Sequence, residues 1–151
     1  MRKNIATGLV LLGGLWSVLA GVIGLLSSEF PPYHEAIAGI MWAEVDPRLQ
    51  TIILADQITQ GSGFLASGLA VLFLLIPLRR GELWAHMASF FIAGANWVPT
   101  LFVAVSLRTI EPAAETPVVP SMILLGLIFG GTVLFLLDRK KLHDTARAGN
   151  V

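Results

Sequence analysis

The chain has 151 residues, of which 55% are hydrophobic and 13% are charged, and its formal net charge is zero. Soluble domains carry about a quarter charged residues, so this composition excludes an ordinary soluble domain and predicts a single membrane domain. The absence of cysteine excludes disulfides, thiolate metal ligands and cysteine nucleophiles. No nucleic-acid-binding surface is visible, and nucleic acid is not an expected partner.

The first predicted element is a membrane-spanning helix over residues 5–26, which follows the basic start Arg2-Lys3. This apolar run can cross about 30 Å of hydrocarbon at about 1.5 Å per residue. It exceeds the apolar core of a signal peptide, and no convincing cleavage site ends it, so we expect it to be retained. Small residues recur along it, where a neighbouring backbone can approach closely. They are Gly13 or Gly14, Ser17, Gly21 and Gly24.

Residues 27–48 form the longest predicted segment outside the spans. The pair Pro31-Pro32 ends the first helix, and the apolar stretch 36–42 predicts a short helix at the membrane surface. Asp46 followed by Pro47 is typical of a helix start, with aspartate as N-cap and proline at the first helical position. We therefore expect the second helix to begin at Pro47, to cross the membrane over residues 49–76 and to end at Pro77.

The third and fourth predicted spans cover residues 83–107 and 118–137. Pro99 lies inside the third span and should kink it. The fourth span contains Gly126 and Gly130 at a spacing typical of closely packed membrane helices. The sequence thus predicts an all-α integral membrane protein, a bundle of four transmembrane helices.

The distribution of basic residues predicts the orientation of this bundle. Eight of the ten lysine and arginine residues fall on one side of the predicted spans, and only Arg48 and Arg108 fall on the other. The positive-inside rule therefore places both termini in the cytoplasm and residues 27–48 outside. We expect a multi-pass protein of a bacterial-type inner membrane, with the lipid bilayer as its main partner.

Polar residues at the opening of the second span are the best candidates for a functional site. Asp56 and Gln60 lie one turn apart on one helical face. An antiparallel third helix brings its own polar residues to matching depths, which predicts a polar seam between the two helices. Asp56 is the candidate catalytic acid–base or cation-binding residue, with Asp46 as a second catalytic candidate. The predicted ligand-binding residues are Gln57, Gln60, Asn96 and Thr100.

A structural role for Asp56 is the favoured alternative. Counting along the helices places Asp56 at the outer membrane interface, level with Arg108 and close to Arg48, where an ion pair would fix the helix register. A carboxylate deep in hydrocarbon would be costly and would argue for function, but an interfacial one argues less strongly.

No metal site or cofactor is predicted. His34-Glu35 resembles the start of a metalloprotease motif, but Ala38 stands where that motif requires its second histidine. His86 lies near the inner interface and is expected to be a hydrogen-bonded histidine of the bundle rather than a proton relay.

The run Asp46-Pro47-Arg48-Leu49-Gln50, followed by Asp56 and by Pro99 in the third span, resembles EXPERA-domain proteins. That family consists of four-helix membrane proteins and includes sterol isomerases and sterol-binding relatives. The resemblance implies that Asp46 and Asp56 line a cavity. The acid that the family carries in its first helix is absent here. The overall pattern equally resembles small bacterial four-helix integral membrane proteins.

The sequence leaves two function classes open. The favoured class is a non-enzymatic membrane protein, either an accessory or assembly subunit that contacts other membrane subunits or a module that binds a lipophilic small molecule. The alternative is an enzyme or carrier for a lipophilic substrate, with Asp56 and Asp46 as acid–base residues. An Asp56–arginine pair would favour the first class. A cavity lined by the predicted polar residues would favour the second.

Overall fold

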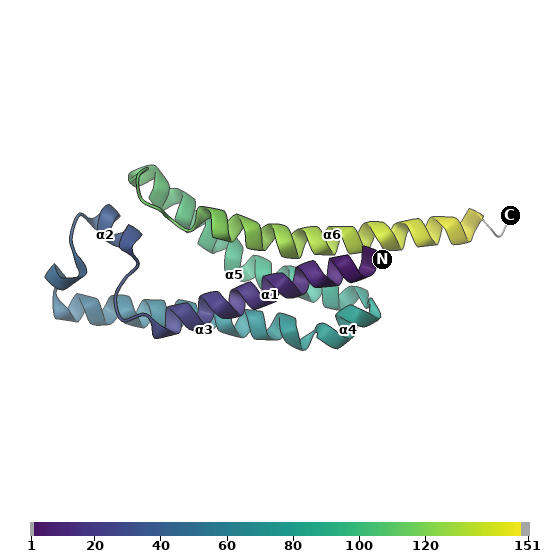
Figure 1. Ribbon diagram of the computed structural model, residues 1–151, viewed down its shortest axis with the longest axis horizontal. Helices are drawn as coiled ribbons and strands as arrows, with labels where there is room; N and C mark the ends of the chain where they lie inside the picture. Colours follow the sequence, from purple (N-terminus) through teal and green to yellow (C-terminus); the bar gives the residue numbers. More distant parts are fainter. Residues whose placement is uncertain (1, 149–151) are drawn as a thin grey trace.

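The computed structural model describes residues 2–148, and the side chains of residues 3–141. This part of the chain is helical apart from its connections, and contains no strand. Four long helices form an elongated bundle, with short helices in two of the connections (Figure 1). The elements are α1 (Arg2–Leu26), α2 (Pro32–Ala38), the 3-10 helix η1 (Trp42–Glu44), α3 (Pro47–Phe73), α4 (Leu75–Arg80), α5 (Leu83–Ile110) and α6 (Val118–Ala148).

Three helices in the described part of the chain are long and apolar enough to cross a membrane. The segments are Lys3–Leu26, Leu83–Ile110 and Val118–Lys141. The expectation of an all-α membrane protein is confirmed to this extent. Helix α3 is not among the three, because its first half carries Asp56, Gln57 and Gln60 and because the apolar run that follows is interrupted after Phe73.

The four long helices form a ring in which α1 packs along α3 on one side and along α6 on the other, and α5 contacts α3 and α6. The N-terminus of α1 lies beside α4 at one end of the bundle, which we call the α4 end (Figure 1). There Thr7 Oγ1 donates a hydrogen bond to the carbonyl of Leu78 at 3.2 Å. Helix α2 and the α5–α6 connection lie at the opposite end, the α2 end.

Small residues bring α1 and α3 into backbone contact. A Cβ added at Gly21 would overlap the backbone of Leu65, and one at Gly68 would lie 2.7 Å from the carbonyl oxygen of Gly14. Gly24 faces Gly61 in the same way, with 3.0 Å from an added Cβ to the Gly61 Cα. The predicted small-residue contact is confirmed, because helices without intervening side chains can pack at their backbones.

Three of the predicted packing glycines do not make the expected contact. Gly13 lies against Ile128 of α6 rather than against α3. In the described residues, no atom lies within 4 Å of a Cβ added at Gly126 or Gly130, so this glycine pair packs against no helix of the chain's described part. The close contact of α6 is made by Gly131 instead, where an added Cβ would lie 2.7 Å from the carbonyl oxygen of Ala6.

The second predicted span is interrupted earlier than expected. Helix α3 begins at Pro47, as predicted, but ends at Phe73, and α4 begins at Leu75. The predicted end at Pro77 is therefore wrong. Proline lacks an N–H, and its ring clashes with the carbonyl four residues earlier, which here belongs to Phe73. The amide of Leu74 bonds instead to the carbonyl of Val71 at 3.2 Å, so the break falls one turn before the proline.

The third and fourth helices are longer than the predicted spans. Helix α5 continues to Ile110, and α6 continues through the basic cluster to Ala148. The basic residues after the predicted fourth span do not end α6, because lysine and arginine have helix propensities similar to that of leucine.

Candidate functional site

The segment between α1 and α3 folds over the α2 end of the bundle. Helix α2 begins at Pro32 and ends at Ala38, followed by Gly39 with φ of 65°. The predicted helix at 36–42 was therefore displaced, because Pro32 is tolerated in a first helical turn and Gly39 ends the helix in a left-handed conformation. The aromatic end of that stretch, Trp42, belongs to η1 instead.

Two hydrogen bonds and a ring contact hold this segment in place. The backbone N–H of Trp42 donates to Glu35 Oε1 at 2.9 Å, and Gln50 Nε2 donates to the Trp42 carbonyl at 2.8 Å. The ring of Trp42 meets the buried ring of Phe30 edge-on, with 4.9 Å between centroids. These contacts link the segment before α2 to the first turn of α3.

Asp46 caps α3. Its Oδ1 accepts a hydrogen bond from the backbone N–H of Arg48 at 2.8 Å, as expected for an N-cap. Its side chain is exposed and lines neither of the two cavities described below. We therefore assign Asp46 a structural role and leave it out of the candidate site.

Two cavities meet beneath α2. The first, of about 660 Å³, lies between α2, α3 and α5, and the second, of about 600 Å³, extends among α1, α3, α5 and the start of α6. Because they share four lining residues, we treat them as the first and second lobes of one cavity. The shared residues are His34, Gln57, Gln60 and Leu107.

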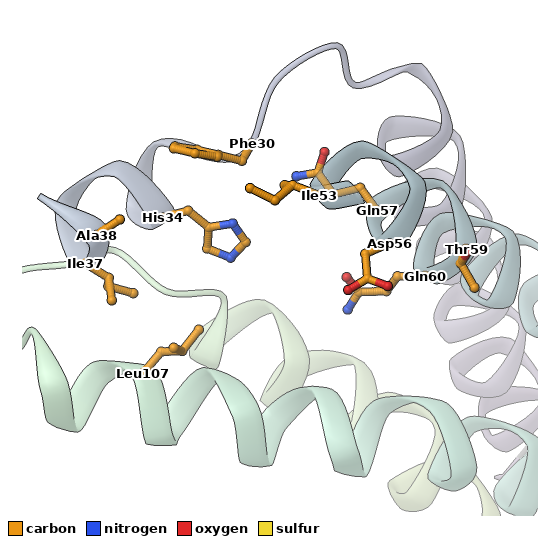
Figure 2. A pocket seen from close by; sticks show the side chains of 10 residues that line it. All are labelled: Phe30, His34, Ile37, Ala38, Ile53, Asp56, Gln57, Thr59, Gln60 and Leu107. Atoms are coloured by element: carbon orange, nitrogen blue, oxygen red, sulfur yellow. The ribbon is translucent and has the colours of Figure 1, made fainter. Parts of the chain in front are cut away.

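The first lobe brings polar side chains of α2 and α3 together. Figure 2 shows Asp56 and Gln60 side by side on α3, His34 reaching in from α2, and Leu107 on the α5 wall. Thr59 also lines this lobe, but its hydroxyl donates to the Ala55 carbonyl of its own helix at 2.8 Å.

The predicted ion pair of Asp56 is wrong. Among the described residues, Asp56 forms no ion pair and no hydrogen bond, and neither Arg48 nor Arg108 pairs with it. Arg48 lies eight residues earlier, about 12 Å along the helix. The first lobe itself separates α3 from α5 at this level, which keeps Arg108 away from the carboxylate.

Gln57 presents an unsatisfied acceptor at the junction of the lobes. Its Oε1 is buried and has no hydrogen-bond partner in the described part of the chain. A buried polar atom without a partner costs about 1–3 kcal/mol. Because this oxygen is closed to solvent, it does not face the open space of either lobe, and we do not count it among the groups available to a ligand.

His34 enters the lobe in its neutral form. Burial lowers the pKa of His34 below its usual value of 6.5, since it disfavours the charged imidazolium. The rings of Tyr33 and Phe30 lie beside it, at 4.3 and 5.9 Å between centroids. Burial also raises the pKa of the Tyr33 hydroxyl, which stays protonated. Among the described residues that line the two lobes, Asp56 is the one acidic residue, and no lysine or arginine lines either lobe.

The second lobe is mainly apolar and extends to a pair of aromatic rings. Phe64 and Trp97 stack with 4.3 Å between their centroids, and Trp97 Nε1 donates to Ser17 Oγ at 2.9 Å. Thr100 lines this lobe, but its hydroxyl donates to the Asn96 carbonyl at 2.8 Å and is therefore already partnered.

Asn96 joins α3 to α5 below the cavity. Its Nδ2 donates to the Gly63 carbonyl at 2.8 Å and to Ser67 Oγ at 2.9 Å. The predicted seam between the second and third helices is thus confirmed at this level. Asn96 lines neither lobe, so its role is structural. Among the predicted ligand-binding residues, Gln57, Gln60 and Thr100 line the cavity.

We expect Asn96→Leu to lower the free energy of unfolding by about 1–2 kcal/mol, because it removes two interhelical hydrogen bonds of roughly 0.6 kcal/mol or more each in a membrane protein. Unfolding in mixed detergent and dodecyl sulfate micelles measures this change. Ser106→Ala is the control, since the Ser106 hydroxyl bonds only to its own helix, at the Phe102 carbonyl. Equal stability of the two variants would contradict the role of the seam.

His86 is buried in the bundle interior and lines neither lobe, but within the described residues it is not the hydrogen-bonded histidine that the sequence predicts. Its side chain is completely buried, and its ring stacks on Phe135 with 3.8 Å between centroids. Neither ring nitrogen has a hydrogen-bond partner in the described part of the chain. Within that same part, no three His, Asp or Glu side chains lie together as a metal site would require.

Sequence reasoning missed the contribution of His34 and of the apolar lining. His34 was considered only as part of a metal motif, and no sequence pattern shows that α2 folds back toward α3. Helix α5 contributes Leu107, Val103 and Trp97 to the lining of the second lobe. These residues share one helical face, but in a sequence this apolar the same pattern also arises from ordinary helix packing.

Fold and site together define a class: an all-helical membrane protein with a large, mainly apolar cavity between its helices and polar groups at one end of that cavity. Comparisons with protein-family models, with curated proteins and with solved structures find no match to this chain.

Proposed function

We propose that this protein is a non-enzymatic membrane module that binds a lipophilic small molecule in the two-lobed cavity. The observation that carries the proposal is the pairing of an apolar second lobe with an unpartnered carboxylate, that of Asp56, in the first. Lobes of about 660 and 600 Å³ fall in the range of about 300–1,000 Å³ typical of ligand pockets.

We further propose that α3 and α4 complete a fourth crossing of a bacterial inner membrane, with both termini in the cytoplasm. The connectivity supports this arrangement. Helix α1 runs to the α2 end and α5 starts at the α4 end, so α3 returns the chain along the length of the bundle. The basic residues Lys3, Arg79 and Arg139 belong to the α4 end, which the positive-inside rule assigns to the cytoplasm.

Single-cysteine labelling tests this orientation, because the chain has no native cysteine. A cysteine replacing the exposed Glu44 should react with a membrane-impermeant maleimide added to intact spheroplasts, and one replacing Arg80 should react only after lysis. The reverse pattern would overturn the orientation and leave the cavity proposal intact.

Binding can be measured by quenching of tryptophan fluorescence. The probe is a monoacylglycerol with bromine at the end of a dodecanoyl chain, added to the full chain in nanodiscs. Bromine quenches at short range, so a chain in the second lobe should quench Trp97. Trp97→Phe, which keeps an aromatic ring beside Phe64, should lose that part of the signal.

A blocking variant completes this test. Thr100→Phe places a ring in the second lobe and should abolish saturable quenching of Trp97. Ser106→Phe adds the same ring on the same helix at a position outside both lobes and should leave quenching unchanged. Quenching that never saturates, or that Thr100→Phe does not alter, would show that the probe stays in the bilayer, and would refute the proposed function.

An enzyme or carrier that uses Asp56 as acid–base is the second candidate. One observation favours it: the neutral His34 imidazole and the Asp56 carboxylate line the same lobe, and such a pair can accept and donate protons. In that case Asp56→Asn would retain quenching by the probe but abolish conversion or transport of the natural molecule.

A further inference from the structure

We infer that the cavity selects amphiphiles whose head group donates hydrogen bonds, and that these bind with the head in the first lobe and the tail in the second. The inference rests on the proposed function and adds the class of ligand and its orientation. It stands on three observations: the chemistry of the groups in the first lobe, the depth of the second lobe, and the side on which the second lobe opens.

The charged group that lines the first lobe is a hydrogen-bond acceptor. The Asp56 carboxylate can only accept hydrogen bonds and has no partner among the described residues. His34 and Gln60 line the same lobe and can each donate and accept hydrogen bonds, so they add no preference for one kind of head group. No cationic side chain lines either lobe in the described part of the chain, since His34 is neutral at neutral pH. A hydroxyl or ammonium head would donate to the Asp56 carboxylate, whereas an anionic head would be repelled by it.

The second lobe is deep enough for an apolar tail. Phe64 lies eight residues beyond Asp56 on α3, which corresponds to about 12 Å along the helix. One leaflet of the hydrocarbon core is half of about 30 Å thick. The distance from Asp56 in the first lobe to Phe64 in the second therefore covers most of the thickness of one leaflet. Because Asp56 lies toward the α2 end and the Phe64–Trp97 pair lies deeper in the bundle, a bound amphiphile keeps the orientation that it has in a leaflet.

The second lobe also reaches the surface that faces lipid. Trp16, Leu19 and Ile23 of α1 line it, although their side chains are 38%, 55% and 59% exposed. Pro117 and Pro120 at the start of α6 form the opposite edge. A tail can therefore enter sideways between α1 and α6 from the bilayer, without leaving an apolar environment.

The test compares head groups on one tail. Dodecyl chains with a terminal bromine carry a hydroxyl, an ammonium, a methyl ether or a sulfonate, and Trp97 quenching in nanodiscs gives an apparent affinity for each. The hydroxyl and the ammonium should bind about tenfold more tightly than the ether and the sulfonate, because a hydrogen bond to a charged group is worth about one such factor. The two donors distinguish a membrane alcohol from a membrane amine.

A variant of the first lobe identifies the group responsible. Asp56→Asn should remove the discrimination against the sulfonate and weaken binding of the ammonium compound by about tenfold. Glu44→Gln removes an exposed carboxylate of the same segment that lines neither lobe, and should change nothing.

The outcomes separate the two proposals. Equal affinity for all four heads, or a preference for the sulfonate in the wild type, would overturn the head-group inference while saturable quenching still upheld the proposed function. Unchanged selectivity in Asp56→Asn would overturn it as well. No saturable quenching by any of the four compounds would refute the proposed function itself.

Discussion

Trp97→Ala is expected to lower the free energy of unfolding by about 4 kcal/mol, the largest effect of any single substitution considered for this chain. Trp97 is 4% exposed, stacks on Phe64 and donates to Ser17 Oγ at 2.9 Å. The substitution removes this packing, leaves the second lobe enlarged and deprives the buried Ser17 hydroxyl of its donor. Unfolding in mixed detergent and dodecyl sulfate micelles provides the measurement.

Trp84→Ala is the matched control, because Trp84 belongs to the same helix but is 56% exposed. We expect this change to cost less than about 0.5 kcal/mol, as is usual for surface positions. Trp97→Phe should fall between the two, with a loss of about 1 kcal/mol for the hydrogen bond to Ser17. If Trp97→Ala and Trp84→Ala were equally stable, the Phe64–Trp97 pair would not be a packed part of the bundle.

Gly21→Ala is expected to destabilise the bundle by about 3 kcal/mol, because inserting a methyl group into a packed contact forces the backbones apart. The added Cβ would lie 2.7 Å from the Cα of Leu65, and backbone atoms cannot move aside as the end of a flexible side chain can. The same unfolding assay measures the loss. The yield of chemical crosslinks between α1 and α3 should also decrease in this variant.

Gly8→Ala makes the same chemical change in the same helix and is the control for this prediction. No atom of the described residues lies within 4 Å of a Cβ added at Gly8. Alanine is favoured over glycine within helices by about 0.5–1 kcal/mol, so this variant should be slightly more stable than the wild type. A Gly21→Ala variant as stable as Gly8→Ala would mean that α1 and α3 do not pack at their backbones.

Local chemistry determined most element boundaries. Asp46 and Pro47 start α3 because the cap bond joins residues only two positions apart. Pro77 interrupts the helix through a clash with a carbonyl one turn away, so even the misjudged boundary was encoded locally. Pro32 and Gly39 delimit α2 by the same kind of short-range constraint. The apolar runs likewise marked three helices able to cross a membrane, because length and hydropathy suffice for that property.

The sequence also determined that small residues would allow close packing. It further indicated that Asn96 would form hydrogen bonds with the second helix. An amide in an apolar bundle needs a hydrogen bond, and matching depth on antiparallel helices identifies where it can find one. It did not determine which helix each glycine would face. The rotation of a helix about its own axis depends on all of its neighbours at once, which is why Gly13 packs on α6 and Gly126 packs on no described helix.

Only the tertiary structure decided the surroundings of Asp56. Its position in the sequence suited an ion pair with Arg48 or Arg108 as well as a cavity, because helical depth alone does not reveal how far apart two helices stand. The structure separates α3 from α5 at the α2 end and folds α2 over the gap, bringing His34 to the same lobe. The carboxylate is left without a cation among the described residues because the space where one would lie is open.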